Sequence, residues 1–177
     1  TENLQRITAE WFVANGFNEV MNNSLRRDDL PDSKMQSIEI LNPLSKELQT
    51  MRKSLYFGLL ENLTYNQNRQ QQVQRLFEFG KSYFLANDKY METRELAFAL
   101  SGKTNDLSWQ NKTHTLNFFS LKQVCQGLIT KLGLKCRIEE GNNSQGFFER
   151  SYQFTLGKES IIEFGEVSLA NCKKAGI

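Results

Sequence analysis

The sequence predicts a single α+β domain over residues 1–177, in which helices pack on an antiparallel or mixed sheet. Apolar residues recur at helical spacing in some segments and alternate with polar residues in others. These segments do not follow the regular strand-helix order of a doubly wound fold. With 177 residues, of which 39% are hydrophobic and 24% charged, the chain can bury the core of one globular domain.

Helices are expected in three parts of the chain. Residues 3–17 carry apolar side chains every three or four positions and end near Asn-Gly, which is a helix stop signal. A second helix is predicted over 55–68, with Ser54 as its N-cap. A third helix is predicted over 121–132, and Gly133 ends it.

Strands are expected where apolar and polar residues alternate. The segment 37–41 has this pattern, and Asn42-Pro43 ends it because a residue before proline is pushed out of the helical region. The stretch 74–87, which reads QRLFEFGKSYFLAN, and the stretch 94–102 are predicted as strands as well. Further strands are predicted in 134–140, 152–156 and 160–168, with a hairpin turn at Gly157-Lys158.

The composition argues against several classes of protein. A net charge of +2 is too small to indicate nucleic-acid binding by charge alone, and no apolar run is long enough to span a membrane. Three widely spaced cysteines and one histidine argue against a disulfide framework or a zinc site, and fit a reducing compartment such as the cytoplasm. Because the chain starts at Thr1 without a signal-peptide pattern, we expect a piece of a longer protein.

Few side chains indicate chemistry by themselves. His114 has no second imidazole or thiolate at a catalytic or metal-binding spacing, so we expect a loop or surface residue. Cys125 lies on the apolar side of a predicted helix and is expected in the core. Glu78 projects from its strand opposite Phe77 and Phe79. It could bind a substrate amine, but we favour a bond to a neighbouring backbone group.

The order of segments resembles the opening of a class II aminoacyl-tRNA synthetase core. The helix ending in 15-NGFNEV-20 resembles the dimer-interface motif of that family, and 75-RLFEFGKSYF-84 resembles the strand of its second motif. On that strand the family has an Arg that holds the α-phosphate of ATP and, two residues later, a Glu that helps to bind the nucleotide. Phe84 and Ala86 stand at those positions here, and the third motif has no counterpart up to Ile177.

More specifically, the chain resembles the catalytic-like core of bacterial phenylalanyl-tRNA synthetase β subunits. Similar stretches follow in the same order at 17–25, 41–70, 75–84, 116–133 and 163–167, and Trp109 before Phe118-Phe119 fits as well. The resemblance implies a non-catalytic module that pairs with a catalytic α subunit in an (αβ)2 heterotetramer. The sequence departs from the family at 144-SQGFFERS-151, where a His-Pro-Gly-Arg run is common.

Our leading hypothesis is a scaffold for the α subunit of a cytoplasmic enzyme that attaches phenylalanine to its tRNA using ATP. The resemblance implies no catalytic residue, cofactor or metal in this segment, whereas the whole enzyme uses ATP and magnesium and binds tRNA. The candidates for contact with the α subunit are Trp11, Phe12, Arg52 and Tyr65. One alternative is an active class II-like ligase with Glu78 and Lys81 in a pocket, and another is a free-standing RNA-binding module.

Overall fold

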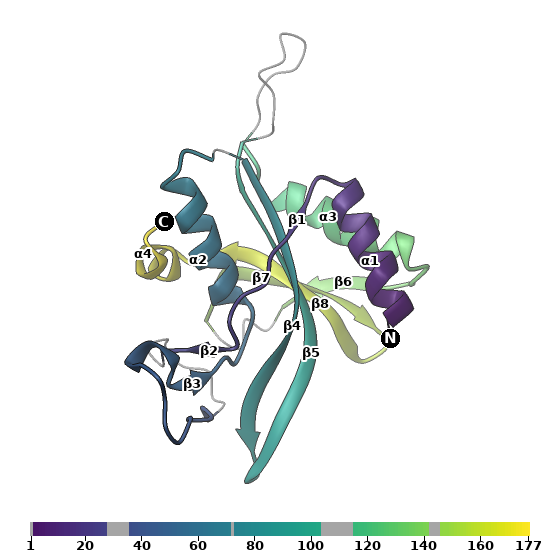
Figure 1. The fold of residues 1–177 in the computed structure, drawn as a ribbon. Coiled ribbons are helices and arrows are strands. Elements are labelled where there is room, and N and C mark those ends of the chain that lie inside the picture. Colours follow the sequence, from purple (N-terminus) through teal and green to yellow (C-terminus); the bar gives the residue numbers. More distant parts are fainter. Residues whose placement is uncertain (1, 28–35, 72, 104–114, 142–145) are drawn as a thin grey trace.

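The computed structural model describes residues 2–27, 36–71, 73–103, 115–141 and 146–177 (Figure 1). The elements are α1 (Glu2–Ala14), β1 (Asn18–Glu19), β2 (Leu25–Arg26), the 3-10 helix η1 (Lys46–Leu48), β3 (Thr50–Met51), α2 (Tyr56–Gln67), β4 (Val73–Ala86), β5 (Lys89–Gly102), α3 (Phe118–Lys131), β6 (Arg137–Glu140), β7 (Phe148–Leu156), β8 (Glu159–Val167) and α4 (Leu169–Ala175). Trp109 and His114 lie outside the described residues.

The strands form separate small sheets. One has the order β1-β4-β5, with β1 parallel to β4 and β4 antiparallel to β5. A second pairs β2 with β3, and a third has the order β6-β7-β8 with antiparallel neighbours. The β4–β5 hairpin turns at Asn87 and Asp88, whose φ angles of 49° and 58° match the two-residue turn typical of twisted hairpins.

Helices cover both faces of the β4–β5 hairpin. Successive residues of a strand point to opposite faces, so Phe77 and Leu76 pack against different helices. On one face Phe77 stacks on Phe12 of α1, with ring centroids 4.9 Å apart, and Leu128 of α3 joins this cluster. On the other face Leu76 packs with Leu60 of α2. Figure 1 shows α2 on one side of the crossing strands and α1 with α3 on the other.

Most of the predicted elements are confirmed, with two corrections. All three predicted helices and the hairpin turn at Gly157-Lys158 are present. The N-cap predicted at Ser54 is wrong: α2 is capped by Leu55, whose side chain is buried and makes no capping hydrogen bond. The strand predicted over 37–41 is also wrong, since only Glu39 there forms an isolated bridge, to Thr50.

Candidate functional site

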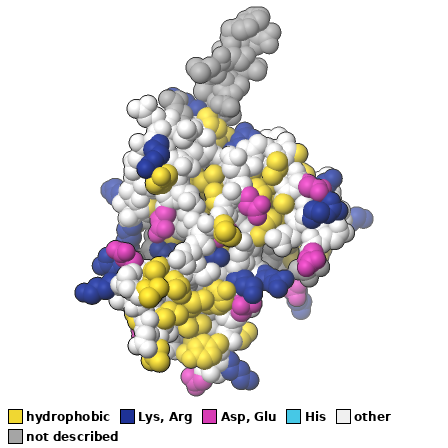
Figure 2. All heavy atoms as spheres, in the orientation of Figure 1, with side chains coloured by type: hydrophobic (Ala, Val, Ile, Leu, Met, Phe, Trp, Pro, Cys, Tyr) yellow, Lys and Arg dark blue, Asp and Glu magenta, His cyan; other side chains and the backbone are white. Residues whose placement is uncertain are grey.

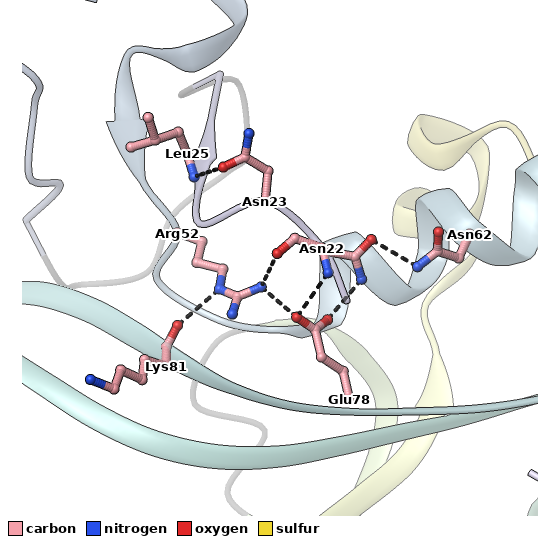
Figure 3. Close-up of polar contacts among 7 residues, drawn as sticks. All are labelled: Asn22, Asn23, Leu25, Arg52, Asn62, Glu78 and Lys81. Atoms are coloured by element: carbon pink, nitrogen blue, oxygen red, sulfur yellow. Dashed lines mark hydrogen bonds and ion pairs between the residues drawn. The ribbon is translucent and has the colours of Figure 1, made fainter. Parts of the chain in front are cut away.

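Glu78 lies in a buried polar cluster between β4 and the segment that follows β1 (Figure 3). Its Oε1 atom is 2.6 Å from Nη1 of Arg52, and the two side chains are 1% and 8% exposed respectively. Arg52 follows directly after β3, so the small β2–β3 sheet brings its guanidinium to the strand. The acid that the sequence singled out is therefore neutralised inside the chain.

Asn22 supplies the remaining donors to this carboxylate. Its backbone N–H donates to Oε1 of Glu78 at 3.2 Å, and its side-chain Nδ2 donates to Oε2 at 2.7 Å. Asn62 of α2 donates in turn to Oδ1 of Asn22 at 2.8 Å. The expected bond from Glu78 to a neighbouring backbone group is thus confirmed. We refer to Asn22, Arg52, Asn62 and Glu78 as the Glu78 cluster.

Arg52 is held at further points along its guanidinium. Nε donates to the carbonyl of Lys81 at 2.9 Å, and Nη1 also donates to the carbonyl of Asn22 at 3.3 Å. Gly80 leaves room for this arrangement, because a Cβ atom there would collide with Nη2 of Arg52 and Cδ2 of Leu55. This buried ion pair and its additional hydrogen bonds hold together β4, the segment that follows β1 and the segment that follows β3. The charge of Glu78 is thereby neutralised by a residue of the same chain.

Lys81 does not join Glu78 in a site. Its Nζ lies 2.8 Å from Oε1 of Glu92, and these side chains are 39% and 48% exposed. Figure 3 shows the Lys81 ammonium pointing away from the Glu78 carboxylate. An exposed pair of this kind contributes about 0.2–1 kcal/mol. The acid and the base of the alternative enzyme hypothesis therefore have separate partners.

Phe84 and Ala86 lie on the last part of β4, just before the hairpin turn. In the β4–β5 register Phe84 is opposite Met91, and Ala86 is opposite Lys89. Both side chains are partly buried. A phenyl ring and a methyl group cannot donate hydrogen bonds to a phosphate. The loss of ATP contacts at these positions stays a prediction.

A groove of about 740 Å³ opens between β5 and β8, with residues of α2 and α3 also lining it. We call it the β5–β8 groove. At one end Oγ of Ser82 donates to Oε1 of Glu95 at 2.7 Å. Burial raises the pKa of Glu95, while the Ser82 bond and the charge of Arg52 oppose the shift. Burial, helped by the charges of Glu163 and Glu95, also raises the pKa of the Tyr56 hydroxyl.

The sequence analysis did not single out these groove residues. Ser82 and Glu95 are 13 positions apart and meet only because of the β4–β5 register. The signal that could have identified Glu95 was its position as an acidic residue within the alternating apolar pattern of 94–102. A sequence pattern gives the face of a strand but not the residue across from it.

The predicted contact residues fall into two groups. Phe12 is 0% and Arg52 6% exposed: within this chain Phe12 packs in the core and Arg52 belongs to the Glu78 cluster, and their contact with the α subunit stays a prediction. Trp11 is partly buried against α3, where a Cβ on Gly127 would meet its ring. Tyr65 is 56% exposed. Trp11 and Tyr65 are thus the members of the set that a partner could reach.

Three large apolar side chains that the sequence analysis did not single out are far more exposed than Tyr65. Met21, Leu41 and Leu44 are 94%, 93% and 94% exposed. Met21 lies between β1 and β2, and the other two lie just before η1. Figure 2 shows hydrophobic side chains gathered on the part of the surface formed around β2 and β3. Exposed apolar patches on soluble proteins commonly mark sites of association.

Other reactive groups are placed as structural residues. Cys125 is 0% exposed, which confirms its predicted core position, and burial raises the pKa of its thiol to about 12. Within the described ranges, no set of three or more His, Cys, Asp or Glu side chains is arranged to hold a metal ion. None of the helices in the described part of the chain has the length and apolarity needed to cross a membrane.

The comparisons with known sequences agree on one family. Residues 1–177 match the family described as the phenylalanyl tRNA synthetase beta chain CLM domain. The chain is 33% identical to the phenylalanine–tRNA ligase beta subunit of Bacteroides thetaiotaomicron, over 93% of this chain and 22% of that protein. It is 30% identical to the beta subunit of Legionella pneumophila, over 75% of this chain and 17% of that protein. The chain thus spans about a fifth of the length of these curated relatives.

Solved structures agree on the fold. A pyrrolysyl tRNA synthetase from Desulfitobacterium hafniense superposes with a TM-score of 0.73 and 13% identity, over 99% of this chain and 61% of that one. At this identity the likeness concerns the fold alone, and it confirms the predicted class II synthetase architecture. With the family match over its whole length, the chain belongs to the phenylalanyl-tRNA synthetase beta chain CLM domains.

Proposed function

We propose that this domain is a non-catalytic scaffold in the β subunit of a phenylalanine–tRNA ligase, where it holds the catalytic α subunit in an (αβ)2 enzyme. The names of the relatives support the enzyme, since they are beta subunits of phenylalanine–tRNA ligase. The whole enzyme would attach phenylalanine to its tRNA in the cytoplasm, using ATP and magnesium. These ligands would bind outside this domain.

The observation that carries the proposal is the neutralised acid on β4. Glu78 is paired with Arg52 and bonded to Asn22, so acting as a base would require breaking a buried ion pair. Removing one partner of such a pair typically costs about 3–5 kcal/mol. Phe84 and Ala86 add no phosphate ligand on the same strand. These features of β4 support a structural role for the strand rather than a catalytic one.

The exposed apolar side chains support a binding role. Met21, Leu41 and Leu44 are each at least 93% exposed, which costs solvation free energy unless a partner covers them. Aromatic and Met side chains are enriched at protein interfaces, while Lys and Glu are depleted. We assign this surface, together with Tyr65, to contact with the α subunit.

ATP–pyrophosphate exchange dependent on phenylalanine tests the proposal. The full-length β subunit alone should show no exchange above background, and adding the α subunit should restore it. In the assembled enzyme Glu95→Gln and Phe84→Ala should leave the exchange rate within about twofold. Robust exchange by the β subunit alone, or its loss in these variants while assembly stays intact, would make this domain the active ligase of the alternative hypothesis.

A further inference from the structure

The turn that ends α1 carries an asparagine followed by a glycine. Asn15-Gly16 is the one Asn-Gly pair in this sequence, and both residues are exposed. Because glycine has no side chain, its backbone nitrogen is the least hindered of any residue and can reach the side-chain carbon of a preceding asparagine. Figure 1 shows α1 leading through this turn into β1. A chemically reactive pair therefore lies at the junction of two elements.

The backbone of this turn is held by a Schellman motif. Gly16 has a φ angle of 77°, in the left-handed region that glycine adopts without strain. The N–H of Gly16 donates to the carbonyl of Val13 at 3.0 Å, and the N–H of Phe17 donates to the carbonyl of Phe12 at 3.1 Å. The rings of Phe12 and Phe17 pack edge to face, with centroids 4.9 Å apart, as the apolar contact of this motif. The nitrogen of Gly16 is thus engaged in the fold.

The side chain of Asn15 is bonded back toward the helix. Its Nδ2 donates to the carbonyl of Trp11 at 2.8 Å, four residues earlier on α1. The backbone carbonyl of Asn15 accepts from Nη1 of Arg75 on β4 at 2.9 Å. Attack by the nitrogen of Gly16 requires the side-chain carbon of Asn15 to approach the peptide group that follows it instead. The folded end of α1 therefore holds the two reacting atoms apart.

Ring closure at such a pair is the first step of deamidation. The backbone nitrogen of Gly16 gives its proton to solvent and bonds to Cγ of Asn15. The Cγ–Nδ2 bond breaks, and Nδ2 takes up a proton from solvent and leaves as ammonia. The resulting succinimide adds water at either ring carbonyl, so breaking one ring C–N bond gives aspartate and breaking the other gives isoaspartate. Water is the co-reactant, and both residues are exposed to it.

The products fit the turn less well than asparagine does. Aspartate at position 15 lacks the Nδ2 donor to Trp11 and places a negative charge at the C-terminal end of a helix, where the helix dipole disfavours it. Isoaspartate adds a methylene group to the backbone. The N–H groups of Gly16 and Phe17 are then displaced from the carbonyls to which they donate. Conversion therefore weakens the same cap that opposes it.

We propose that Asn15-Gly16 is a gated deamidation site: the cap of α1 suppresses ring closure in the folded domain, and opening of this turn lets the pair convert to aspartate and isoaspartate. Helix ends open locally more often than a whole domain unfolds. Because the loss of ammonia is not reversed, the converted fraction accumulates with the time that the end of α1 spends open. The chemistry at Asn15 does not depend on the proposed role toward the α subunit.

Mass spectrometry of the peptide that contains Asn15 tests the site and its gate. The assembled enzyme and the same full-length chain in guanidinium chloride are incubated at one pH in water enriched in heavy oxygen, which marks conversion during the incubation. Asn15 should convert faster than Asn68, which precedes Arg69, in the denatured chain, and at least about tenfold more slowly in the folded enzyme. Equal rates in the two states, or no preference for Asn15 in the denatured chain, would overturn the proposal.

A pair of arginine variants tests whether the cap is the gate. Arg75→Ala removes the donor to the carbonyl of Asn15 and should speed conversion in the folded enzyme by about threefold or more, with the denatured rate unchanged. The matched control Arg69→Ala removes a donor to the carbonyl of Tyr65 near the end of α2, at 3.1 Å, and should leave both rates unchanged. No acceleration by Arg75→Ala, or equal acceleration by both variants, would contradict gating by the end of α1.

Discussion

The Glu78 cluster and the β5–β8 groove lie on opposite edges of one hairpin, and they differ in how their polar groups are used. On the β4 side the carboxylate of Glu78 receives donors from Arg52 and Asn22, at 2.6 to 3.2 Å. On the β5 side, residues of β5 and β8 line a groove of about 740 Å³. The side of the Glu78 cluster holds chain segments together through polar contacts, and the side of β5 lines an open groove.

The comparison shows that an acid on a strand, such as Glu78, can serve the fold rather than a catalytic site. The buried carboxylate of Glu78 already has a matched cation and two further donors within the chain, so its hydrogen-bonding capacity is used in the fold. Both features lie on a hairpin that resembles an ATP-binding strand, on which the side chains of Phe84 and Ala86 cannot donate hydrogen bonds to a phosphate.

Breaking the Glu78 cluster should have the largest effect. Arg52→Ala leaves Glu78 buried without its cation and should destabilise β4 by about 3–5 kcal/mol. Hydrogen exchange of β4 amides in the full-length subunit measures this as faster opening. The control Lys81→Ala removes an exposed pair and should cost no more than about 1 kcal/mol. Equal effects of the two substitutions would show that the buried pair is not what fixes β4.

The second-largest effect is expected at Gly80, where the Arg52 side chain passes close to the backbone. Gly80→Ala adds a methyl group that collides with Arg52 and Leu55, and overpacking of this kind costs about 1–3 kcal/mol. The same substitution should cost less in an Arg52→Ala background, because one of the two blocking groups is gone. Measuring both variants by β4 amide exchange gives a double-mutant cycle. Strictly additive effects would contradict the predicted crowding.

The exposed apolar surface gives a smaller, separable effect. Met21→Asp places a charge on a side chain that is 94% exposed, so domain stability should change by less than about 0.5 kcal/mol. Affinity for the α subunit should fall by about tenfold, which corresponds to about 1.4 kcal/mol. Sedimentation of the mixed subunits measures assembly. Tyr90→Asp, on the hairpin, is the control, and an equal loss there would remove Met21 from the interface.

The smallest effect concerns the polar end of the groove. Burial raises the pKa of Glu95 in the folded protein above its ordinary value of 4.5, so the folded state binds more protons than the unfolded state between these values. Stability should therefore fall as pH rises through that window. Glu95→Gln removes this titration and should flatten the pH dependence measured by denaturant unfolding. Ser82→Ala, which removes the opposing hydrogen bond, should steepen it, and a flattened profile there would contradict the assignment.

Local features of the sequence predicted most of the elements. The helices were found because their apolar faces repeat within a few residues, and β4 and β5 were found because alternation is visible in short stretches. The segment 37–41 alternates too, but apart from the bridge at Glu39 it forms no ladder among the described residues, so propensity alone was not sufficient.

The candidate site was less predictable because it depends on distant pairings. Glu78 could be singled out as an acid on a strand, but its partner Arg52 lies 26 positions away and reaches it through the β2–β3 pairing. The groove depends on the order of strands within two sheets, which periodicity does not contain. The exposure of Met21 likewise follows only from what the folded chain leaves uncovered.

Titration of adenylate sites in the assembled enzyme tests the central claim most directly, that this synthetase-like domain performs no activation chemistry. Enzyme mixed with labelled phenylalanine, ATP and magnesium, without tRNA, should form one adenylate per αβ pair in a single burst. That number should not change in the Glu95→Gln or Phe84→Ala variants. Two adenylates per αβ pair, with one lost on substitution in this domain, would contradict the account.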